Sequence, residues 1–313
     1  MNMKKQKFGK LLLRQLRKNY FFYLLAIPGI IALILFSYIP MAGIYLAFED
    51  YSYKGGIFGS EFVGLHNFKI FFGNMNTVLR AVRNTVVINF GSLLIGLIMN
   101  VAVAIILNEI LSERFRKVTQ SLMLFPHFLS WIVIGAVSGA FLSKDGGVLN
   151  KIVEMFGGEA ISWYTSPKYW WAILIFVSVW KGFGYGSVVY YATITGFDPS
   201  LYEAARVDGA GRWKQIWMIT VPLLRPTIVL MFLLNVGNIL GGSLDFIMGM
   251  TKLQGKLLPT TDTVTTLVYR LTMEDANYGS SAAASLLQSV VGCFFVLTSN
   301  LIAKKIDPEY ALF

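Results

Sequence analysis

One charged side chain, Lys181, lies about a dozen residues inside a long apolar stretch, next to Trp180 and near Tyr185. A charge at that depth of a membrane costs roughly 3 kcal/mol, so it normally faces a protein interior or a watery cavity. Aromatic side chains beside a polar group suit sugars, because sugar ring faces stack on aromatics while sugar hydroxyls bond polar groups. Two interpretations stay open. Lys181 lines a path for a polar solute, or it pairs with a carboxylate or helix terminus of another subunit.

Two amides form a second candidate for such a path. Asn235 and Asn238 are three positions apart, which places them on one face of a helix, and Gly237 and Gly241 lie beside them. Amides inside spans either line a polar path or hydrogen-bond between helices, and packing is the usual role of any single one. The pair is the best candidate among the amides that the apolar stretches carry.

The chain lacks the residue patterns of enzymes and of metal sites. It contains no G-x-x-x-x-G-K-[ST] loop for ATP, no Ser/His/Asp constellation and no H-E-x-x-H. His66 and His127 are isolated from other ligand-type residues, so no metal site is expected. Cys293 is the only cysteine, which excludes a disulfide within the chain. We therefore expect neither catalysis nor a cofactor, and energy must come from a separate subunit that binds ATP.

A short charged segment between two apolar stretches carries the most distinctive spacing in the chain. Its pattern is E-A-A, three residues, Gly, nine residues and I-x-V-P. These positions, with the aspartate before the glycine, are Glu203, Ala204, Ala205, Asp208, Gly209, Ile219 and Pro222.

Local signals predict the shape of this segment. Ser200 lies three residues before the glutamate, the spacing of a capping box, which predicts a helix from about Leu201. Gly209 can end that helix in the left-handed conformation. A second short helix over about 211–218 would follow, and Pro226 suits the first turn of the next span. The segment is predicted to be a helix-turn-helix at the membrane surface.

The composition is that of a membrane protein. Of 313 residues, 55% are hydrophobic and 14% are charged, and the mean hydropathy is +0.60. A soluble domain carries about 25% charged residues. Six stretches are long enough to span a bilayer, which takes roughly 20 apolar residues. The sequence therefore predicts an all-α membrane protein with six transmembrane helices, at 20–48, 84–108, 119–142, 169–196, 221–242 and 282–303.

Basic residues are concentrated on one side of these spans. The two tails and the loops 109–118 and 197–220 carry 15 basic and seven acidic residues, while the other loops are nearly balanced. Basic residues stay in the cytosol, so both termini and the 197–220 loop are predicted to be cytoplasmic. The net charge of +10 thus reports topology, and no basic face for nucleic acid is visible. The expected organisation is a basic tail at 1–19, a transmembrane domain at 20–303 and a cytoplasmic tail at 304–313.

Five further motifs lie along the chain: Phe36-Ser-Tyr38-Ile39-Pro40-Met41-Ala-Gly43, Phe62-Val63-Gly64-Leu65-His66-Asn67-Phe68, Asn84-Thr85, Leu107-Asn108-Glu109-Ile110 and Pro126-His127-Phe128-Leu129-Ser130-Trp131. They resemble motifs of LplB-type permeases, which belong to the maltose-permease-like group of carbohydrate importers. The E-A-A segment resembles the cytoplasmic coupling loop of ABC importer permeases. Only Val221 departs from that loop pattern, because leucine is usual there.

The resemblance implies a type I ABC importer permease fold with a coupling helix between the fourth and fifth transmembrane helices. It implies four kinds of partner: a second and different permease subunit, two ATPase subunits that bind the ATP, an external solute-binding protein and the lipid bilayer. The E-A-A segment would contact the ATPase. The cargo would be an oligosaccharide or polysaccharide fragment that enters a bacterial cell across its membrane.

Other functions remain open from the residues alone. A permease for an amino acid, a polyamine or phosphate would use the same loop but needs pore charges complementary to its ligand. Lys181 is the only mid-span charge, which suits a mostly neutral cargo and also admits an acidic, uronate-type sugar. A secondary transporter or channel would show inverted repeats and broken, ion-coordinating helices. A membrane scaffold or insertion factor would carry no cargo at all.

Overall fold

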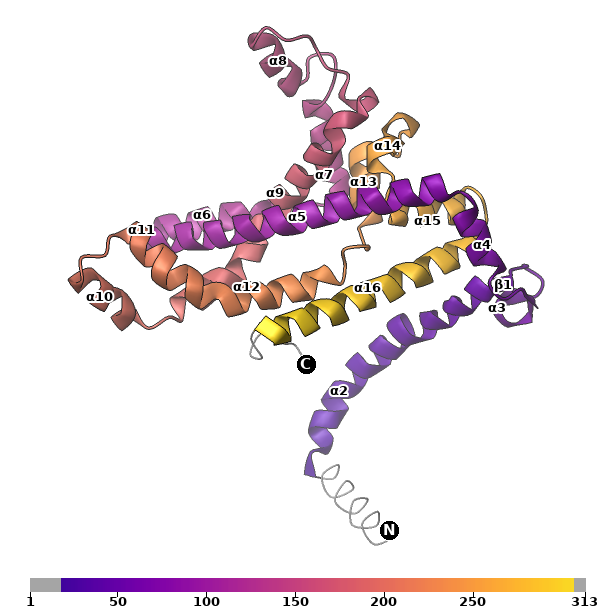
Figure 1. Ribbon diagram of the computed structural model, residues 1–313, viewed down its shortest axis with the longest axis horizontal. Helices are drawn as coiled ribbons and strands as arrows, with labels where there is room; N and C mark the ends of the chain where they lie inside the picture. The colour runs from indigo at the N-terminus through magenta and orange to yellow at the C-terminus, as the bar shows by residue number, and fades with distance from the viewer. Residues whose placement is uncertain (1–17, 307–313) are drawn as a thin grey trace.

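The computed structural model describes residues 18–306, and helices dominate this part of the chain (Figure 1). The predicted basic tail at 1–19 and the C-terminal tail lie largely outside the described residues. Five described helices are long and apolar enough to cross a membrane: Tyr20–Phe48, Met75–Glu109, Pro167–Thr195, Arg212–Val236 and Tyr278–Lys305. Five of the six predicted spans therefore coincide with long helices.

The remaining predicted span, 119–142, is not one straight helix. Helix α6 (Glu113–Phe128) and helix α7 (Trp131–Phe141) meet at an angle of 97°. Leu129 is extended between them, and the Ser130 side chain accepts a hydrogen bond from the Val133 amide at 3.3 Å. A serine that caps a new helix starts it in a new direction. Counting the bent pair as one span gives the six that were predicted.

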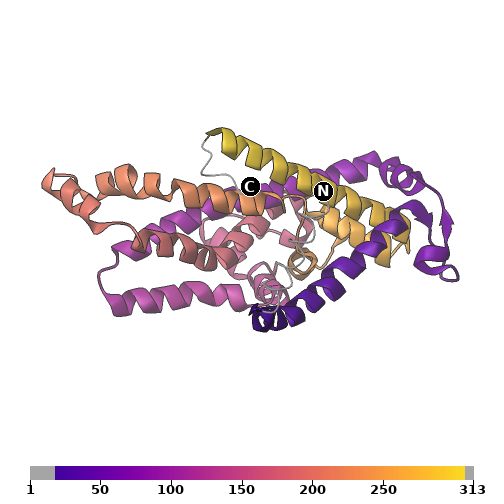
Figure 2. The same cartoon turned by 90° about the horizontal axis from the view of Figure 1, so that it is seen from below.

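The long helices lie side by side along the longest axis of the molecule. Helix α5 (Met75–Glu109) packs along α9 (Trp170–Thr195), and α12 (Val221–Val236) packs against α16 (Tyr278–Ile306). At 35 residues, α5 is about 52 Å long, which exceeds the roughly 30 Å of a bilayer core. Helix α10 (Pro199–Val207) lies at one end of this bundle, and Figures 1 and 2 both place β1 (Glu49–Asp50) and α3 (Gly56–Gly59) at the other.

The first long helix leaves the bundle (Figure 1). It comprises α2 (Tyr20–Leu33) and the turns over Ile34–Phe48, of which the last ten residues pack against α16. No residue of α2 is buried, and Phe36 is 81% exposed. This helix therefore presents its apolar side chains to lipid or to another subunit.

Two helix contacts depend on glycine. Gly135 in α7 lies against the backbone of Gly249 in α13 (Leu244–Thr251), and a Cβ at Gly135 would overlap the Gly249 carbonyl. Gly184 in α9 lies equally close to the Met123 carbonyl in α6. Small residues let helix backbones approach in membranes. The glycines hold both halves of the bent pair against the bundle.

The end opposite α10 is built from short elements and a buried ion cluster. Asp262 is fully buried and pairs with Arg80 at 2.9 Å and Arg270 at 2.8 Å. The Asn84 side chain donates to the Asp262 carbonyl at 3.0 Å. These bonds join α5, through Arg80 and Asn84, to Asp262. The elements at or near this end are β1 (Glu49–Asp50), α3 (Gly56–Gly59), β2 (Glu61–Phe62), α4 (His66–Gly73), α14 (Leu258–Thr261) and α15 (Val264–Met273), whereas α8 (Val148–Met155) projects from the side of the bundle (Figure 1).

The fifth span differs from its predicted bounds at both ends. The predicted second coupling helix, about 211–218, is not separate, because helix runs without a break from Arg212 to Val236. Pro226 accordingly lies inside this helix and not in its first turn. The helix ends at Val236, before the predicted residue 242. At the C-terminus, α16 continues to Ile306, so the predicted boundary at 303 is not the end of an element.

Candidate functional site

Helix α10 of the coupling loop begins with a different cap from the one predicted. Asp198 is the N-cap, and its Oδ1 accepts a hydrogen bond from the Ser200 amide at 2.9 Å. Pro199 occupies the first helical position, where its fixed φ and missing N–H cost nothing. The predicted capping box from Ser200 is therefore wrong, and the helix starts two residues earlier than predicted. The backbone hydrogen bond from Ser200 holds the pKa of Asp198 below its usual value.

The end of α10 confirms the predicted role of Gly209. This glycine has φ +76°, and its amide donates to the Arg206 carbonyl at 3.0 Å. The Ala210 amide donates to the Ala205 carbonyl at 2.8 Å. Together these two bonds form a Schellman motif, which satisfies the last carbonyls of the helix. Helix α10 is thus fixed at both ends by local hydrogen bonds.

Side chains attach the coupling loop to the helices at its base. The Gln215 side chain donates to the Ala210 carbonyl at 2.8 Å, and Gln215 is 3% exposed. The Tyr202 hydroxyl lies 3.0 Å from the Thr220 hydroxyl. Arg212 reaches Glu109 at the end of α5 across 3.7 Å. The loop is therefore joined to both α5 and α12.

The predicted coupling residues divide into a surface set and a base set. Glu203, Ala204, Asp208 and Gly209 are exposed, whereas Ala205, Ile219 and Pro222 are half-buried. Ile219 lies in the wide helical turn before α12, and Pro222 lies in the first turn of α12. The first set is available to a partner. The second set fixes the loop to the fifth span.

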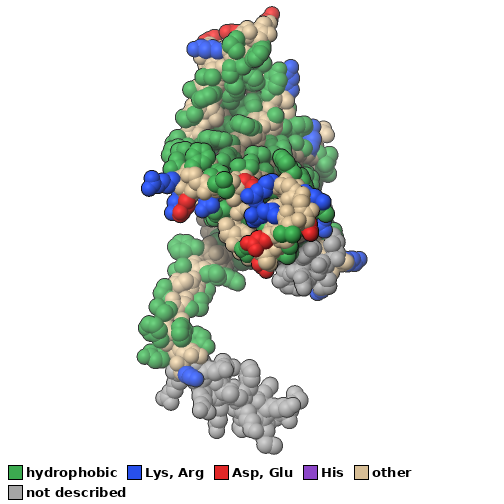
Figure 3. All heavy atoms as spheres, turned by 90° about the vertical axis from the view of Figure 1, so that its left-hand side faces the viewer, with side chains coloured by type: hydrophobic (Ala, Val, Ile, Leu, Met, Phe, Trp, Pro, Cys, Tyr) green, Lys and Arg blue, Asp and Glu red, His purple; other side chains and the backbone are tan. Residues whose placement is uncertain are grey.

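Sequence reasoning missed two apolar residues on α10. Val207 is 88% exposed and Leu201 is 45% exposed, on a helix whose other exposed side chains are mostly polar. Figure 3 views this end of the molecule face-on and shows Lys, Arg, Asp and Glu side chains gathered there beside hydrophobic flanks. An exposed apolar side chain among charges is typical of a docking surface.

Lys181 bonds the C-terminal end of α6. Its Nζ donates to the carbonyl oxygens of His127 at 2.6 Å and Leu129 at 2.7 Å. It also lies 5.1 Å from the centre of the Trp131 ring. A cation at a helix C-terminus satisfies free carbonyls and complements the helix dipole. The predicted helix-terminus contact is present, but that terminus belongs to the same chain and not to another subunit.

The aromatic neighbours of Lys181 lie in separate environments. Tyr185 is 58% exposed, and its ring stacks on His127 with the centres 4.2 Å apart. Trp180 lines an apolar cavity of about 580 Å³ with Phe176 and Leu129. Both aromatic residues therefore lie near the bend where Lys181 bonds, with Tyr185 stacked on His127 and Trp180 in the apolar cavity that Leu129 also lines.

The two candidate amides do not share a face. Asn235 lines a polar cavity of about 180 Å³ between α5, α9 and α12, together with Ser92 and Asn100. Asn238 lies beyond the end of α12 and lines a different cavity of about 330 Å³ with Gln288. The prediction that they form one pair fails because the helix ends at Val236. Each amide still lines a cavity, although both residues are exposed and the Asn235 side chain donates to the Met231 carbonyl at 2.7 Å.

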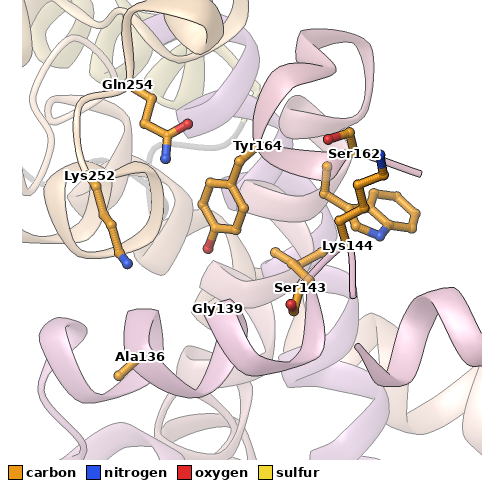
Figure 4. Close-up of a pocket in the computed structure, with 10 residues that line it drawn as sticks. Ala136, Gly139, Ser143, Lys144, Ser162, Tyr164, Lys252 and Gln254 are labelled. Atoms are coloured by element: carbon orange, nitrogen blue, oxygen red, sulfur yellow. The ribbon is translucent and has the colours of Figure 1, made fainter. Parts of the chain in front are cut away.

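A larger polar pocket, of about 500 Å³, was not predicted (Figure 4). Lys144 and Lys252 line it with Tyr164 and Gln254, and no Asp or Glu within residues 18–306 is among its lining residues. The Tyr164 hydroxyl and the Lys252 amine point toward the same space beside Gly139. The Tyr164 hydroxyl oxygen is buried and bonds no described residue. Burial also raises the pKa of Tyr164, which keeps its hydroxyl a proton donor.

No sequence motif marks this pocket, because its two lysines are more than 100 residues apart and meet only in the fold. The pocket can bind an anionic group, because the Lys252 ammonium and the Tyr164 phenol point into it and Lys144 also lines it. Within residues 18–306, no group of three or more His, Cys, Asp or Glu side chains could hold a metal ion.

These features define a helical membrane protein with an exposed loop helix that is capped at both ends and with polar cavities between its helices, which is the architecture of a transport permease. A family model described as "Binding-protein-dependent transport system inner membrane component" matches residues 92–308, and the chain belongs to that family. The family comprises the membrane-embedded permease components of ABC importers, so the chain is a non-catalytic transporter subunit.

Curated relatives and solved structures extend over nearly the whole chain. The polygalacturonan/rhamnogalacturonan transport system permease protein YteP of Bacillus subtilis is 35% identical over 98% of this chain and 94% of its own length. Protein LplB of Bacillus subtilis is 34% identical over 94% of this chain and 92% of its own length.

A crystal structure of a bacterial ABC transporter involved in the import of the acidic polysaccharide alginate contains a similar chain. That chain matches with a TM-score of 0.84 and 31% identity, over 95% of this chain and 99% of that one. A second structure, of the alginate transporter in complex with an alginate pentasaccharide-bound periplasmic protein, has a chain that matches with a TM-score of 0.84 and 32% identity, over 94% of this chain and 98% of that one. The fold is that of a type I ABC importer permease.

Proposed function

We propose that the chain couples ATP hydrolysis in a partner ATPase to the import of an oligosaccharide or polysaccharide fragment. The observation that carries this proposal is helix α10, which is exposed, capped at both ends and bonded through Tyr202 to Thr220 just before α12. Arg212, after the turn that follows α10, joins the same loop to Glu109 of α5. A rigid helix passes the movement of a bound partner to the helices it is attached to, whereas a flexible loop would change its own shape instead. Glu203, Ala204, Asp208 and Gly209 contact the ATPase, and Val207 adds an apolar contact.

The transport step follows from this attachment. When the two ATPase subunits close on ATP, the grooves that hold α10 move. The motion passes through the loop to α5 and α12, which alternates the pore between states open to the cytosol and to the outside. ATP stays on the partner subunits throughout.

The assembly that this function needs matches the free surfaces of the chain. A second, different permease subunit covers apolar surface such as that of α2, and an external solute-binding protein delivers the cargo at the end opposite α10. The surplus of basic residues on one set of segments supports a cytoplasmic position for both termini and α10. The host is a bacterium and the chain lies in its cell membrane.

We further propose that the cargo carries carboxylate groups. Lys144, Lys252 and the Tyr164 hydroxyl form an anion-binding pocket on segments predicted to be external. The names of the relatives point the same way, because polygalacturonan and alginate are acidic polysaccharides. The candidate path residues are Lys181, Trp180, Tyr185, Asn235 and Asn238, and three of them can be given a role. Asn235 and Asn238 face cavities that can bond sugar hydroxyls, and Lys181 stabilises the bend between α6 and α7.

Uptake by the whole transporter in vesicles tests the coupling. The double variant Glu203→Lys with Gly209→Trp should abolish ATP-driven uptake, because it reverses a surface charge and blocks the left-handed turn. Glu113→Lys, which alters another exposed acid on a predicted cytoplasmic segment, is the control and should retain uptake. Full uptake by the double variant, or uptake driven by a sodium or proton gradient without ATP, contradicts the proposal.

A separate pair of variants tests the cargo. Lys144→Gln with Lys252→Gln should raise the KM for oligogalacturonate about tenfold or more, since hydrogen bonds to charged groups contribute about 1.5–3 kcal/mol each. The KM for a neutral oligosaccharide of the same length should not change. An equal change in KM for both sugars would indicate that the lysines have a structural role.

A further inference from the structure

Glu49 is a buried carboxylate with no counterion in the described chain. Its side chain is among the largest that are fully buried, with 1% of the residue exposed. Its Oε2 accepts no hydrogen bond from residues 18–306. A buried charge normally has an opposite charge or several hydrogen-bond donors beside it, because losing water is costly. An unpaired carboxylate therefore indicates a partner group supplied from outside the chain.

The carboxylate lines a pocket of about 310 Å³ at the end of the molecule opposite α10 (Figure 1). Two more acids, Asp50 and Asp275, line the same pocket and are exposed at its rim. Tyr51 and Tyr278 also line it, with ring centres 5.3 Å apart. No lysine or arginine among the described residues lines the pocket, and His66 is its basic side chain, so acidic side chains outnumber basic ones there.

Hydrogen bonds hold this pocket in place without using the Glu49 carboxylate. The Asn67 side chain, 5% exposed, donates to the main-chain carbonyls of Ala47 at 3.2 Å and Glu49 at 2.8 Å. Gly279 at the start of α16 lies directly against the Asn67 amide, where a Cβ would come within 2.5 Å. The Tyr278 hydroxyl is bonded to another tyrosine at 2.8 Å. The backbone and the tyrosine rings are therefore ordered, while the buried acid is left free.

The chemistry of the pocket selects a planar organic cation. A guanidinium group bonds carboxylates through two parallel hydrogen bonds and stacks on aromatic faces. Tyrosine faces attract cations placed over them. A buried acid at the base, two acids at the rim and two tyrosine rings match all of these contacts.

We propose that this pocket receives an arginine side chain of the external solute-binding protein, as an anchor for docking. The inference rests on the proposed function, in which that protein docks on the end opposite the ATPase. Docking that buries the arginine pairs the Glu49 charge. Association therefore satisfies a group that is unpaired in the free permease, and Asp50 and Asp275 attract the arginine as it approaches.

Binding of the solute-binding protein to the whole transporter in lipid nanodiscs tests the inference. Glu49→Gln keeps the shape of the side chain and removes its charge, and it should raise the Kd roughly 30-fold or more. It should also weaken the dependence of Kd on salt. Glu61→Gln removes an exposed acid from the paired strand β2 and should change the Kd less than about threefold. Basal ATPase activity and the amount of assembled transporter should equal wild type in both variants.

A charge exchange gives a second test. Glu49→Arg should abolish docking, and an Arg→Glu substitution at one surface position of the solute-binding protein should restore it. Equal Kd values for wild type and Glu49→Gln overturn the inference, as does loss of the second permease subunit from the variant complex. An effect of Glu49→Gln that chelation by EDTA removes assigns the pocket to a metal ion and also overturns it. If wild type binds no solute-binding protein at all, the proposed function fails, and this inference fails with it.

Discussion

Replacing Lys181 by methionine should destabilise the bend between α6 and α7. Two short hydrogen bonds from a charged donor contribute about 1.5–3 kcal/mol each. The contact with the Trp131 ring adds about 0.5–1 kcal/mol. Methionine saves about 3 kcal/mol by removing a charge from membrane depth. The balance is a loss of about 2 kcal/mol.

Thermal denaturation of the purified transporter measures this loss. A loss of about 2 kcal/mol should lower the midpoint by roughly 4–8 °C. Lys181→Arg should recover most of the stability, because arginine can bond the same carbonyls. Tyr185→Phe is the control, since the Tyr185 hydroxyl makes no hydrogen bond to the described residues of the bend and its ring stacking on His127 is kept.

The same variant separates the two roles considered for Lys181. If the lysine only holds the bend, Lys181→Met lowers stability and the amount of active transporter, and the KM for cargo stays constant. A raised KM with an unchanged denaturation midpoint would refute the structural account and place the lysine in the cargo path.

Three further predictions concern the coupling loop and the helix contacts. Gly209→Ala should cost about 1–2 kcal/mol locally, since alanine resists the left-handed conformation, and should lower cargo-stimulated ATPase activity, with Gly209→Asn less harmful. The pKa of Asp198 is lowered on folding, so its helix cap is complete at neutral pH and is lost as pH falls through the folded-state pKa. A spin label on α10 should therefore become more mobile only in acid. In the Asp198→Ala variant the same label should be mobile at every pH. Gly135→Leu should force α7 away from Gly249 and reduce the yield of folded transporter. Gly43→Ala is the control and should keep the yield, because no atom lies near the added Cβ. Equal yields of the two variants would contradict a packing role for Gly135.

The spans and the coupling loop were predictable because both depend on local composition. Long apolar stretches specify transmembrane helices wherever they occur, and Gly209 ends α10 for a reason contained in its own backbone. The start of α10 was harder, since Asp198 and Ser200 both offer caps. Pro199 decides between them, because proline is preorganised for the first helical position.

The candidate path was less predictable because it depends on where helices end and which helices meet. Asn235 and Asn238 share a face only if α12 continues beyond Val236, and it does not. Lys181 finds its partners more than 50 residues away, on a bend that hydropathy cannot detect. The Lys144 and Lys252 pocket forms only when α7 and α13 pack together through Gly135 and Gly249. The helical periodicity of the sequence does not reveal any of these contacts.

The 97° bend between α6 and α7 also bears on whether the chain crosses the membrane an even or an odd number of times. A chain with an even number of crossings returns its end to the side where it began, and an odd number separates the two ends. Both ends carry surplus lysine or arginine, which favours an even number. If both ends lie on one side, as proposed above, the bent pair counts as one crossing, in which the chain moves sideways within the membrane before it completes the passage. The lysine that bonds this bend would thereby help to keep the two ends of the protein on one side.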